Sequence, residues 1–362
     1  MLITAIENFV LFSTVFALAS FVLALTARQA TAKELWRPRA DSVARLYTAA
    51  IVTPPLAALW LVAAAFLPRL WLTREAFEAA HSPPYHQLHL VGELTVAVEP
   101  TLSYALALFV IVISVFSVWS NAVGSWRVGN VIKRLDLNAA APPPEQVALV
   151  NDIAAQRALA VGLVMTDYPL SFVWGFRRSK VIVSSGLLRT LTAKELTGVL
   201  EHEAEHHERR DNLFKLVLSL CTYTSLVFPL SRIILRWRAT EVEVVCDEAA
   251  VARTGAPLEL AEALVKLRRQ TISGFLPSEP ASTTAIVSGF VSANALTFQY
   301  RVTRLLSLVD SIPDCAERRV HRYAKKATAS FVAASLVTLL GISIFAPLSV
   351  HHAAEALIHI LK

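Results

Sequence analysis

The sequence is poor in cysteine and in charge. Its 3 cysteines, Cys221, Cys246 and Cys315, form no CxxC pair, which argues against a disulfide framework and against a cysteine zinc site. Charged residues make up 17% of the chain, whereas an ordinary soluble domain carries about 25%. The sequence also has no fixed-period repeat. These shortages exclude a disordered chain, a collagen-like chain and a single small soluble domain.

Apolar residues are abundant instead, and they gather in long runs. Hydrophobic residues make up 55% of the 362 residues, and the mean hydropathy is +0.51. A membrane-spanning helix needs about 20 mostly apolar residues. The segments of that length, which we predict to span a bilayer, are roughly 5–26, 47–69, 101–122 and 328–349. The pair Pro54-Pro55 predicts a kink in the second of them.

Loop charges predict how these segments are oriented. The loops after the first and third segments and before the fourth are basic, whereas the loop after the second is acidic. We therefore expect the N-terminus outside, in a multi-pass protein of a bacterial inner or plasma membrane. The expected domains are a three-span membrane region, a cytoplasmic domain, a fourth transmembrane helix and a short external tail, at 1–122, 123–327, 328–349 and 350–362.

The chain is basic overall, with a net charge of +6 and a pI of about 9.3. In a membrane protein such an excess reports topology and contact with lipid headgroups. Because no nucleic-acid-binding motif accompanies it, we expect the lipid bilayer as a partner and no direct nucleic acid.

The segment expected in the cytoplasm has a mixed α and β pattern. Apolar spacing and β-rich runs predict one helix and then three strands, over 145–158, 160–166, 171–176 and 180–185. Thr192 and Glu195 match a capping box, which predicts a helix over about 193–213. The expected fold class is a mainly α membrane protein with an α+β cytoplasmic domain inserted between spans three and four.

The helix expected at 193–213 carries a metal-binding pattern, His202-Glu-Ala-Glu-His206. His202 and His206 lie at i and i+4, so both imidazoles leave one helix face a turn apart and can share one Zn²⁺. Glu203 flanks that position, where it can exchange a proton with metal-activated water. The alternative is a polar, solvated helix face, because the surrounding run 201–211 is rich in charge.

A third ligand is expected about 37 residues further along the chain. Glu243 and Asp247 lie at i and i+4 of a helical stretch, so Glu243 can bind the ion. Asp247 can then orient an imidazole N–H or pin the two helices together. Glu241 is a rival ligand and Glu248 a weaker one, and an ordinary acidic helix end is the alternative interpretation.

A fifth apolar run, 216–230, is too short to be assigned by length. Its 15 residues suit a buried or interfacial helix better than a span. Since His202 and Glu243 must meet at one ion, the residues between them must return to the same side of the membrane. We therefore predict a membrane-dipping or core-packed helix at 216–230.

Several stretches of this region occur in a characteristic order. They are Phe172-Val-Trp-Gly-Phe, Lys180-Val-Ile-Val-Ser-Ser-Gly-Leu-Leu, Leu191-Thr-Ala-Lys-Glu-Leu, His202-Glu-Ala-Glu-His206 with Arg209 and Asp211, and Glu243-Val-Val-Cys-Asp247 with Ala250. In this order and spacing, the segment from about 165 to 255 resembles the BlaR/MecR-type membrane metallopeptidases, which are gluzincins. It is similar, more distantly, to the membrane zinc proteases that process CAAX proteins and heat-shock substrates.

The resemblance implies a gluzincin metallopeptidase site with Zn²⁺ as its cofactor. It implies that His202, His206 and Glu243 bind the ion, that Glu203 is the general base and acid, and that Asp247 supports the ligands from behind. It also implies that the strand near 180–185 binds an extended peptide by β-addition. Because 13 residues follow the fourth expected span, we expect a member that lacks the C-terminal penicillin-binding sensor domain.

The oxyanion-stabilising group stays open among four candidates, Tyr300, Arg209, Arg253 and His321. Arg209 and Asp211 are interpreted as a supporting or structural pair behind the ligands. His207 is expected to point away from the metal into solvent.

The expected function is that of a membrane-bound zinc endopeptidase whose active site faces the cytoplasm. Its expected substrate is a cytoplasmic or membrane-proximal protein, such as a transcriptional repressor or the protein's own chain, and a separate sensor protein is a further expected partner. One alternative is a non-catalytic membrane signalling or scaffold protein that retains a zinc site. Another is a regulator whose histidines sense zinc.

Overall fold

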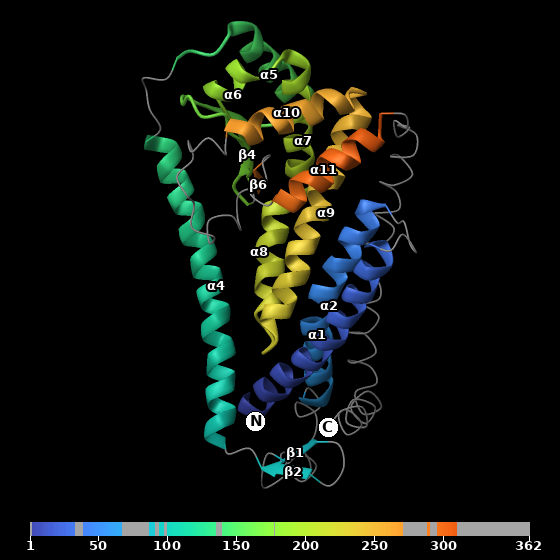
Figure 1. The fold of residues 1–362 in the computed structure, drawn as a ribbon. Helices are drawn as coiled ribbons and strands as arrows, with labels where there is room; N and C mark the ends of the chain where they lie inside the picture. Colours follow the sequence, from blue (N-terminus) through green and yellow to red (C-terminus); the bar gives the residue numbers. More distant parts are fainter. Residues whose placement is uncertain are drawn as a thin grey trace.

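The chain is a mostly helical, elongated molecule with a bundle of long helices at one end and a smaller α+β body at the other (Figure 1). The structure, a computed structural model, describes residues 2–32, 39–66, 87–90, 94–97, 100–134, 140–176, 178–270, 288–289 and 295–309. The expected fourth span, 328–349, and the expected tail, 350–362, lie outside the described residues.

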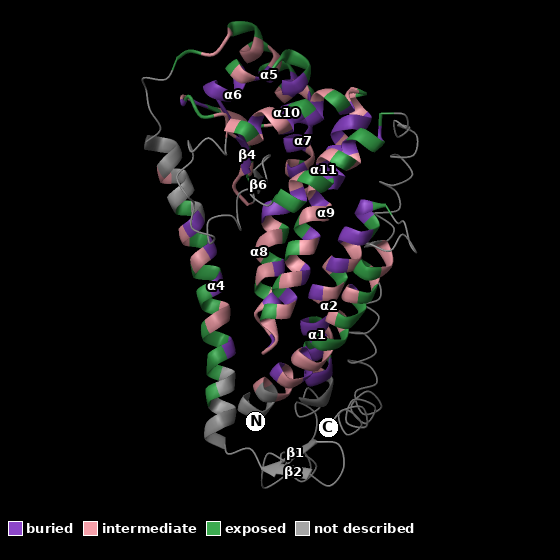
Figure 2. Cartoon of the chain, viewed as in Figure 1, coloured by how far each residue is buried: buried purple, intermediate pink, exposed green. Residues whose placement is uncertain are grey.

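Long apolar helices make up the bundle. They are α1 (Leu2–Ala32), α2 (Ala40–Phe66) and α4 (Pro100–Arg134). By length and composition, the stretches Asn8–Thr31 and Ala40–Ala63 are able to cross a membrane. The third expected span lies in α4, whose apolar stretch is shorter, Leu108–Gly124. Large apolar residues of α4 such as Phe116 and Trp119 are exposed. Figure 2 colours much of the middle of α4 as exposed.

A small hairpin lies at the end of the bundle away from the body (Figure 1). It pairs β1 (Gln87–Leu90) with β2 (Leu94–Ala97) in antiparallel register. The N-terminal end of α1 and the first residues of α4 lie at this same end. The hairpin and the N-terminal end of α1 therefore lie at the same end of the molecule.

The body begins with the elements predicted from the sequence. The first helix and three strands are α5 (Pro144–Arg157), β3 (Val161–Val164), β4 (Ser171–Trp174) and β5 (Lys180–Ser184). They are followed by α6 (Ser185–Thr190) and α7 (Ala193–Arg209), and later by α10 (Pro257–Gln270), β6 (Ser288–Gly289) and α11 (Ala295–Ser307). The predicted helix and strands are thus confirmed, with boundaries shifted by a few residues.

The sheet has the strand order β3-β5-β4-β6. β3 runs parallel to β5, while β4 is antiparallel to both β5 and β6. Because β5 has a neighbour on each side, its backbone groups are already paired, and the expected addition of a peptide at 180–185 is wrong. Strand order depends on pairing between distant segments, which the period of a single strand does not report.

Helix α7 runs through the centre of the body's hydrophobic core. Leu196, Val199 and Leu200 are buried against β5, α9 and α10. Burial of each such side chain contributes roughly 1.5–3 kcal/mol. The helix starts with the predicted capping box, in which the Thr192 hydroxyl accepts from the Glu195 N–H and the Glu195 carboxylate accepts from the Thr192 N–H.

The prediction that this helix continues to residue 213 is wrong. Arg210 adopts a left-handed conformation, with φ 54° and ψ 41°, and this residue ends α7 and precedes α8 (Asp211–Thr222). A side chain with a Cβ pays about 1–2 kcal/mol for this conformation, so the break needs tertiary support. The change in direction carries α8 out of the body and along the bundle (Figure 1).

Helix α8 forms one arm of a helical hairpin whose second arm is α9 (Phe228–Thr254). Its turn contacts α1, because the Leu226 N–H donates to the Thr14 hydroxyl at 3.0 Å and Ser13 Oγ lies 3.3 Å from Thr224 Oγ1. α9 then runs back along α2 into the body. The chain therefore returns from α8 to the site as predicted, but the single helix predicted at 216–230 is wrong, because residues 223–227 form the turn between α8 and α9.

Candidate metal centre

The candidate site lies where α7 and α9 cross at the base of the body. α7 supplies His202, Glu203 and His206, all of which are buried. α9 supplies Glu243 and Asp247 from the half that enters the body. The polar run around the motif is therefore not a solvated helix face, because the motif side chains point into the protein.

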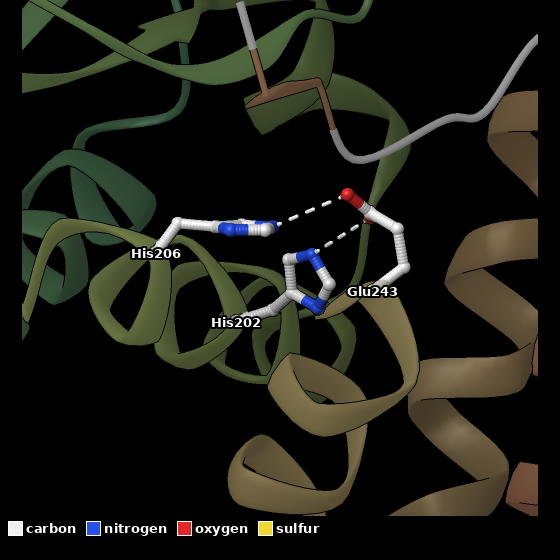
Figure 3. Close-up of side chains that lie close together, drawn as sticks. All are labelled: His202, His206 and Glu243. Atoms are coloured by element: carbon white, nitrogen blue, oxygen red, sulfur yellow. Dashed lines mark ion pairs between the residues drawn. The ribbon is translucent and has the colours of Figure 1, made fainter. Parts of the chain in front are cut away.

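Three side chains form a triangle of potential ligands. Figure 3 shows the imidazoles of His202 and His206 turned toward the carboxylate of Glu243. His202 Nε2 lies 3.5 Å from Glu243 Oε2, and His206 Nε2 lies 3.5 Å from Glu243 Oε1. One ligand atom from each of the three residues lies within 4.8 Å of the other two.

This triangle fits a zinc ion. Two donors bound tetrahedrally at zinc's usual distance of about 2.0–2.2 Å lie roughly 3.4 Å apart, close to the separations seen here. Within the described residues, His206 Nε2 is buried without a hydrogen-bond partner. A buried nitrogen of this kind is costly unless something binds it, and the donor set of two imidazoles and a carboxylate suits zinc.

Each imidazole is oriented from behind by a carboxylate. His202 Nδ1 lies 2.9 Å from Asp247 Oδ1, and His206 Nδ1 lies 2.8 Å from Asp211 Oδ2. A proton on each Nδ1 is donated to the carboxylate, which leaves the Nε2 lone pair directed at the shared position. In the structure Asp247 lies behind His202, and Asp211 lies behind His206.

Arginines hold these carboxylates in turn. Arg301 of α11 places Nε 2.7 Å from Asp247 Oδ2 and NH1 3.1 Å from Glu243 Oε2. Arg209 Nε lies 3.5 Å from Asp211 Oδ2 and also reaches α2, where its NH1 lies 3.5 Å from Asp41 Oδ1. Arg209 and Asp211 therefore form the expected pair behind His206.

Sequence reasoning missed Arg301. It lies on the buried stripe of α11 with Thr297 and Leu305, at four-residue spacing. An arginine on such a stripe is a signal in itself, since a buried guanidinium almost always has a partner. Its partners lie more than fifty residues away, so the sequence alone could not name them.

Glu203 has an environment suited to moving a proton. Its side chain is fully buried, and neither carboxylate oxygen has a hydrogen-bond partner of normal geometry among the described residues. Burial raises the pKa of Glu203, and the neighbouring imidazoles of His202 and His206 only partly offset this. By contrast, His206, His202 and Arg301 outweigh burial at Glu243 and hold its pKa well below the ordinary value.

The rival ligands lie elsewhere. Glu241 accepts from the Tyr300 hydroxyl at 3.5 Å, and Glu248 pairs with Arg304 at 2.8 Å. Neither belongs to a set of potential ligands in the described part of the chain.

Three of the oxyanion candidates contact other side chains, and the fourth lies outside the described residues. Arg253 pairs with Glu201 and Glu205, at 3.2 and 3.0 Å. Tyr300 and Arg209 have the partners given above, and His321 lies outside the described residues. The expectation of a solvated His207 is wrong, because this residue is half-buried and its Nδ1 lies 2.8 Å from the Ser179 hydroxyl.

A second set of potential ligands shares one histidine with the first. It consists of His206, Asp211 and Cys246, with Cys246 Sγ 3.5 Å from His206 Nδ1. That nitrogen already faces Asp211, so a metal there would displace the bond that orients the imidazole. The first set leaves this bond intact and is the better candidate.

The stretch of chain that carries the site is similar to a known family. Residues 145–288 match Peptidase family M48. Members of this family are metallopeptidases, and the matched stretch contains all three candidate ligands and Glu203. It ends before Arg301. The family match also supports the broader resemblance to membrane zinc proteases. The more specific BlaR/MecR-type assignment stays a prediction.

Part of the chain is also similar to individual proteins that are named as proteases. The chain is 29% identical over 121 residues to a protein named Protease HtpX homolog from Thermococcus kodakarensis, covering 32% of this chain and 40% of that protein. It is 29% identical over 185 residues to the Methanopyrus kandleri protein of the same name, covering 43% and 55%. A Burkholderia ambifaria protein of that name is 30% identical over 115 residues, covering 30% and 39%. The chain thus spans about half or less of these relatives.

Proposed function

We propose that this protein is a membrane-bound zinc endopeptidase that cleaves a cytoplasmic or membrane-proximal protein. The observation that carries the proposal is the buried triangle of His202, His206 and Glu243 with the carboxylate of Glu203 beside it. The match of residues 145–288 to a peptidase family supports the same reaction class. A structural zinc site has no need of a buried carboxylate next to the ligands, and Glu203 supplies one.

Each residue of the candidate site has a distinct role in the proposed hydrolysis. His202, His206 and Glu243 would hold the ion, and a zinc ion bound there supplies Lewis-acid chemistry, polarising a peptide carbonyl and acidifying water. Glu203 accepts a proton from the attacking water and returns it to the leaving amine. Burial raises the pKa of Glu203, which makes its carboxylate a stronger base than that of an exposed glutamate.

We further propose that the site faces the cytoplasm from an inner or plasma membrane. The apolar stretches Asn8–Thr31 and Ala40–Ala63 and the exposed apolar face of α4 support a bilayer around the bundle. The proposed division is a membrane region at 1–122, a peptidase domain at 123–327, a fourth span at 328–349 and an external tail at 350–362. A sensor protein and a repressor substrate are the proposed partners.

The test compares two glutamates of the same helix. Glu203→Gln removes the buried carboxylate, while Glu205→Gln changes a residue whose carboxylate faces Arg253 instead. With detergent-purified protein and labelled casein as the probe, we expect Glu203→Gln to lose about 10²–10⁴-fold in cleavage rate and Glu205→Gln to keep most of it. Self-cleavage is read on the same gels.

Zinc content completes the test. Wild type and Glu203→Gln should each carry about one zinc per chain, whereas His202→Ala and Glu243→Ala should carry little. Equal cleavage by wild type and Glu203→Gln would overturn the mechanism. Zinc that is bound without any cleavage, whatever the variant, would favour a scaffold or a zinc-sensing regulator.

A further inference from the structure

Arg301 contacts both a candidate ligand, Glu243, and the carboxylate that supports another ligand, Asp247. It is 1% exposed. Its Nε and NH2 each lie 2.7 Å from a different oxygen of Asp247, and its NH1 lies 3.1 Å from Glu243 Oε2. It comes from α11, beyond the segment that matches the peptidase family.

The planar guanidinium suits this double contact. Two parallel N–H donors grip one carboxylate in fixed geometry, and the remaining edge is left for a second acceptor. The grip on Asp247 fixes the carboxylate that orients His202. The contact with Glu243 Oε2 holds that carboxylate so that Oε1 faces His206 Nε2. One side chain therefore sets the direction of two of the three candidate ligands.

We propose that Arg301 is a positioning residue that completes the zinc site by fixing Glu243 directly and His202 through Asp247. The inference rests on the proposed function only in taking His202, His206 and Glu243 as a metal site. The HExxH helix and the glutamate helix thus supply the ligands, and α11 supplies the charge that orders them.

An oxyanion role for Arg301 is a poorer fit. Its donors are directed at Asp247 and Glu243, and almost none of its surface is exposed to a substrate. An arginine that stabilises a substrate charge must present a donor at the substrate position. Arg301 acts on the ligands and through them.

Arg304 offers a matched control on the same helix. It lies one turn further along α11 and also pairs with a glutamate of α9, with Nε and NH2 each 2.8 Å from Glu248 Oε1. Glu248 does not belong to the candidate ligand set. Arg304→Gln thus removes an arginine–glutamate pair between the same two helices without touching the site.

The experiment measures zinc affinity of the full chain in detergent by competition with a chromogenic chelator. Arg301→Gln should bind zinc at least about tenfold more weakly than wild type, and Arg304→Gln should match wild type within about twofold. Arg301→Lys keeps the charge without the planar fork and should give an intermediate value. Cobalt-loaded Arg301 variants should show altered visible absorption, because the ligand geometry changes.

Folding is controlled separately. Circular dichroism and thermal melts of zinc-free protein establish that each variant is folded at the temperature of the titration. Arg301→Gln leaves Asp247 buried without its counter-charge. If that variant does not fold, the comparison is made with Arg301→Lys and with the neutral double variant Asp247→Asn/Arg301→Gln, against Asp247→Asn alone.

The outcomes separate the inference from the proposed function. Folded Arg301 variants with wild-type zinc affinity and a wild-type cobalt spectrum would overturn the inference while leaving the peptidase proposal intact. A wild type that binds no zinc would overturn the proposed function and the inference with it. A loss of affinity in Arg304→Gln equal to that in Arg301→Gln would overturn the inference, because both arginines would then act only through the packing of α11 on α9.

Discussion

At the scale of single residues, the site is a set of buried charges that neutralise one another. Asp211, Asp247 and Glu243 are opposed by Arg209, by Arg301 and by the imidazoles. Burial of an isolated charge would cost several kcal/mol, so each group depends on its partner. Removal of any one of these groups should therefore lower both the affinity of the site for zinc and the free energy of unfolding.

Asp211→Asn tests this dependence on the His206 side. Asparagine keeps the size of aspartate but presents a neutral oxygen, so the bond to His206 Nδ1 at 2.8 Å weakens and Nε2 becomes a poorer donor. We expect zinc affinity to fall by about 10–100-fold, measured by chelator competition. Asp152→Asn, on an exposed position of α5, is the control. Unchanged affinity in Asp211→Asn would mean that this carboxylate does not orient the ligand.

Residue-level prediction from the sequence succeeded where the information is local. His202, Glu203 and His206 are adjacent on one helix, so spacing alone placed their side chains together. Arg301 could not be found this way, because its partners are on another helix and the connection is set by packing. Sequence reasoning favoured Glu243 and kept Glu241 as a rival, and in the structure Glu241 lies against Tyr300 instead.

At the scale of elements, the start of α7 is held in place by a capping box and an ion pair. Glu195 is 1% exposed, accepts from the Thr192 N–H and pairs with Lys266 at 2.5 Å. This capping box begins the helix on which the HExxH motif lies, two turns before His202. Its bonds therefore fix the N-terminal end of the helix that carries the motif.

Glu195→Gln tests the charge of this cap and its pH dependence. Burial would raise the pKa of Glu195, but the bonds from Lys266 and Thr192 outweigh it and lower the pKa. A lowered pKa means that the ionised form adds stability above the unfolded pKa, near 4.3, and that this is lost as pH falls through the folded value. We expect a loss of about 1 kcal/mol at pH 7 that shrinks below about pH 4.

The measurement is denaturant unfolding in zinc-free buffer from pH 7 to pH 3. Lys194→Gln serves as the comparison, because the neighbouring Lys194 side chain is 79% exposed. It should stay within about 0.5 kcal/mol of wild type at each pH. A gap between Glu195→Gln and wild type that stays constant down to pH 3 would contradict the assigned charge effect.

Element boundaries were predictable only where a local signal exists. The capping box marked the start of α7, but nothing local marked its end, because Arg210 is a poor choice for a left-handed residue. The strand positions were found from composition, whereas the inner place of β5 was not, since pairing order is a property of the whole sheet. The return of 216–230 was deduced from the chemistry that required it.

At the scale of the molecule, α9 joins the apolar bundle to the body as one continuous helix. Its first half lies beside α1 and α2, where the rings of Trp237 and Phe21 stack with their centroids 6.1 Å apart. Its second half carries Glu243 into the body. The site therefore lies at the junction of the two parts, close to the surface that the proposed bilayer would reach.

Cysteine labelling tests the proposed orientation. In a background without Cys221, Cys246 and Cys315, Lys194→Cys should resist a membrane-impermeant maleimide in intact cells and react in inverted vesicles. Ser82→Cys, in the acidic loop, should behave in the opposite way. Labelling of both positions from the same side would refute the orientation, and no labelling of either in any preparation would refute their exposure.

The position of Arg301 in the chain also sets an order of events during synthesis. Its guanidinium leaves the ribosome roughly sixty residues after Glu243, which at about 5–20 residues per second is a delay of roughly 3–12 seconds. For that interval the nascent chain holds the candidate zinc ligands without the arginine proposed to order them. The peptidase site would thus come into being in two steps, and its last component arrives only when translation has passed the catalytic helices.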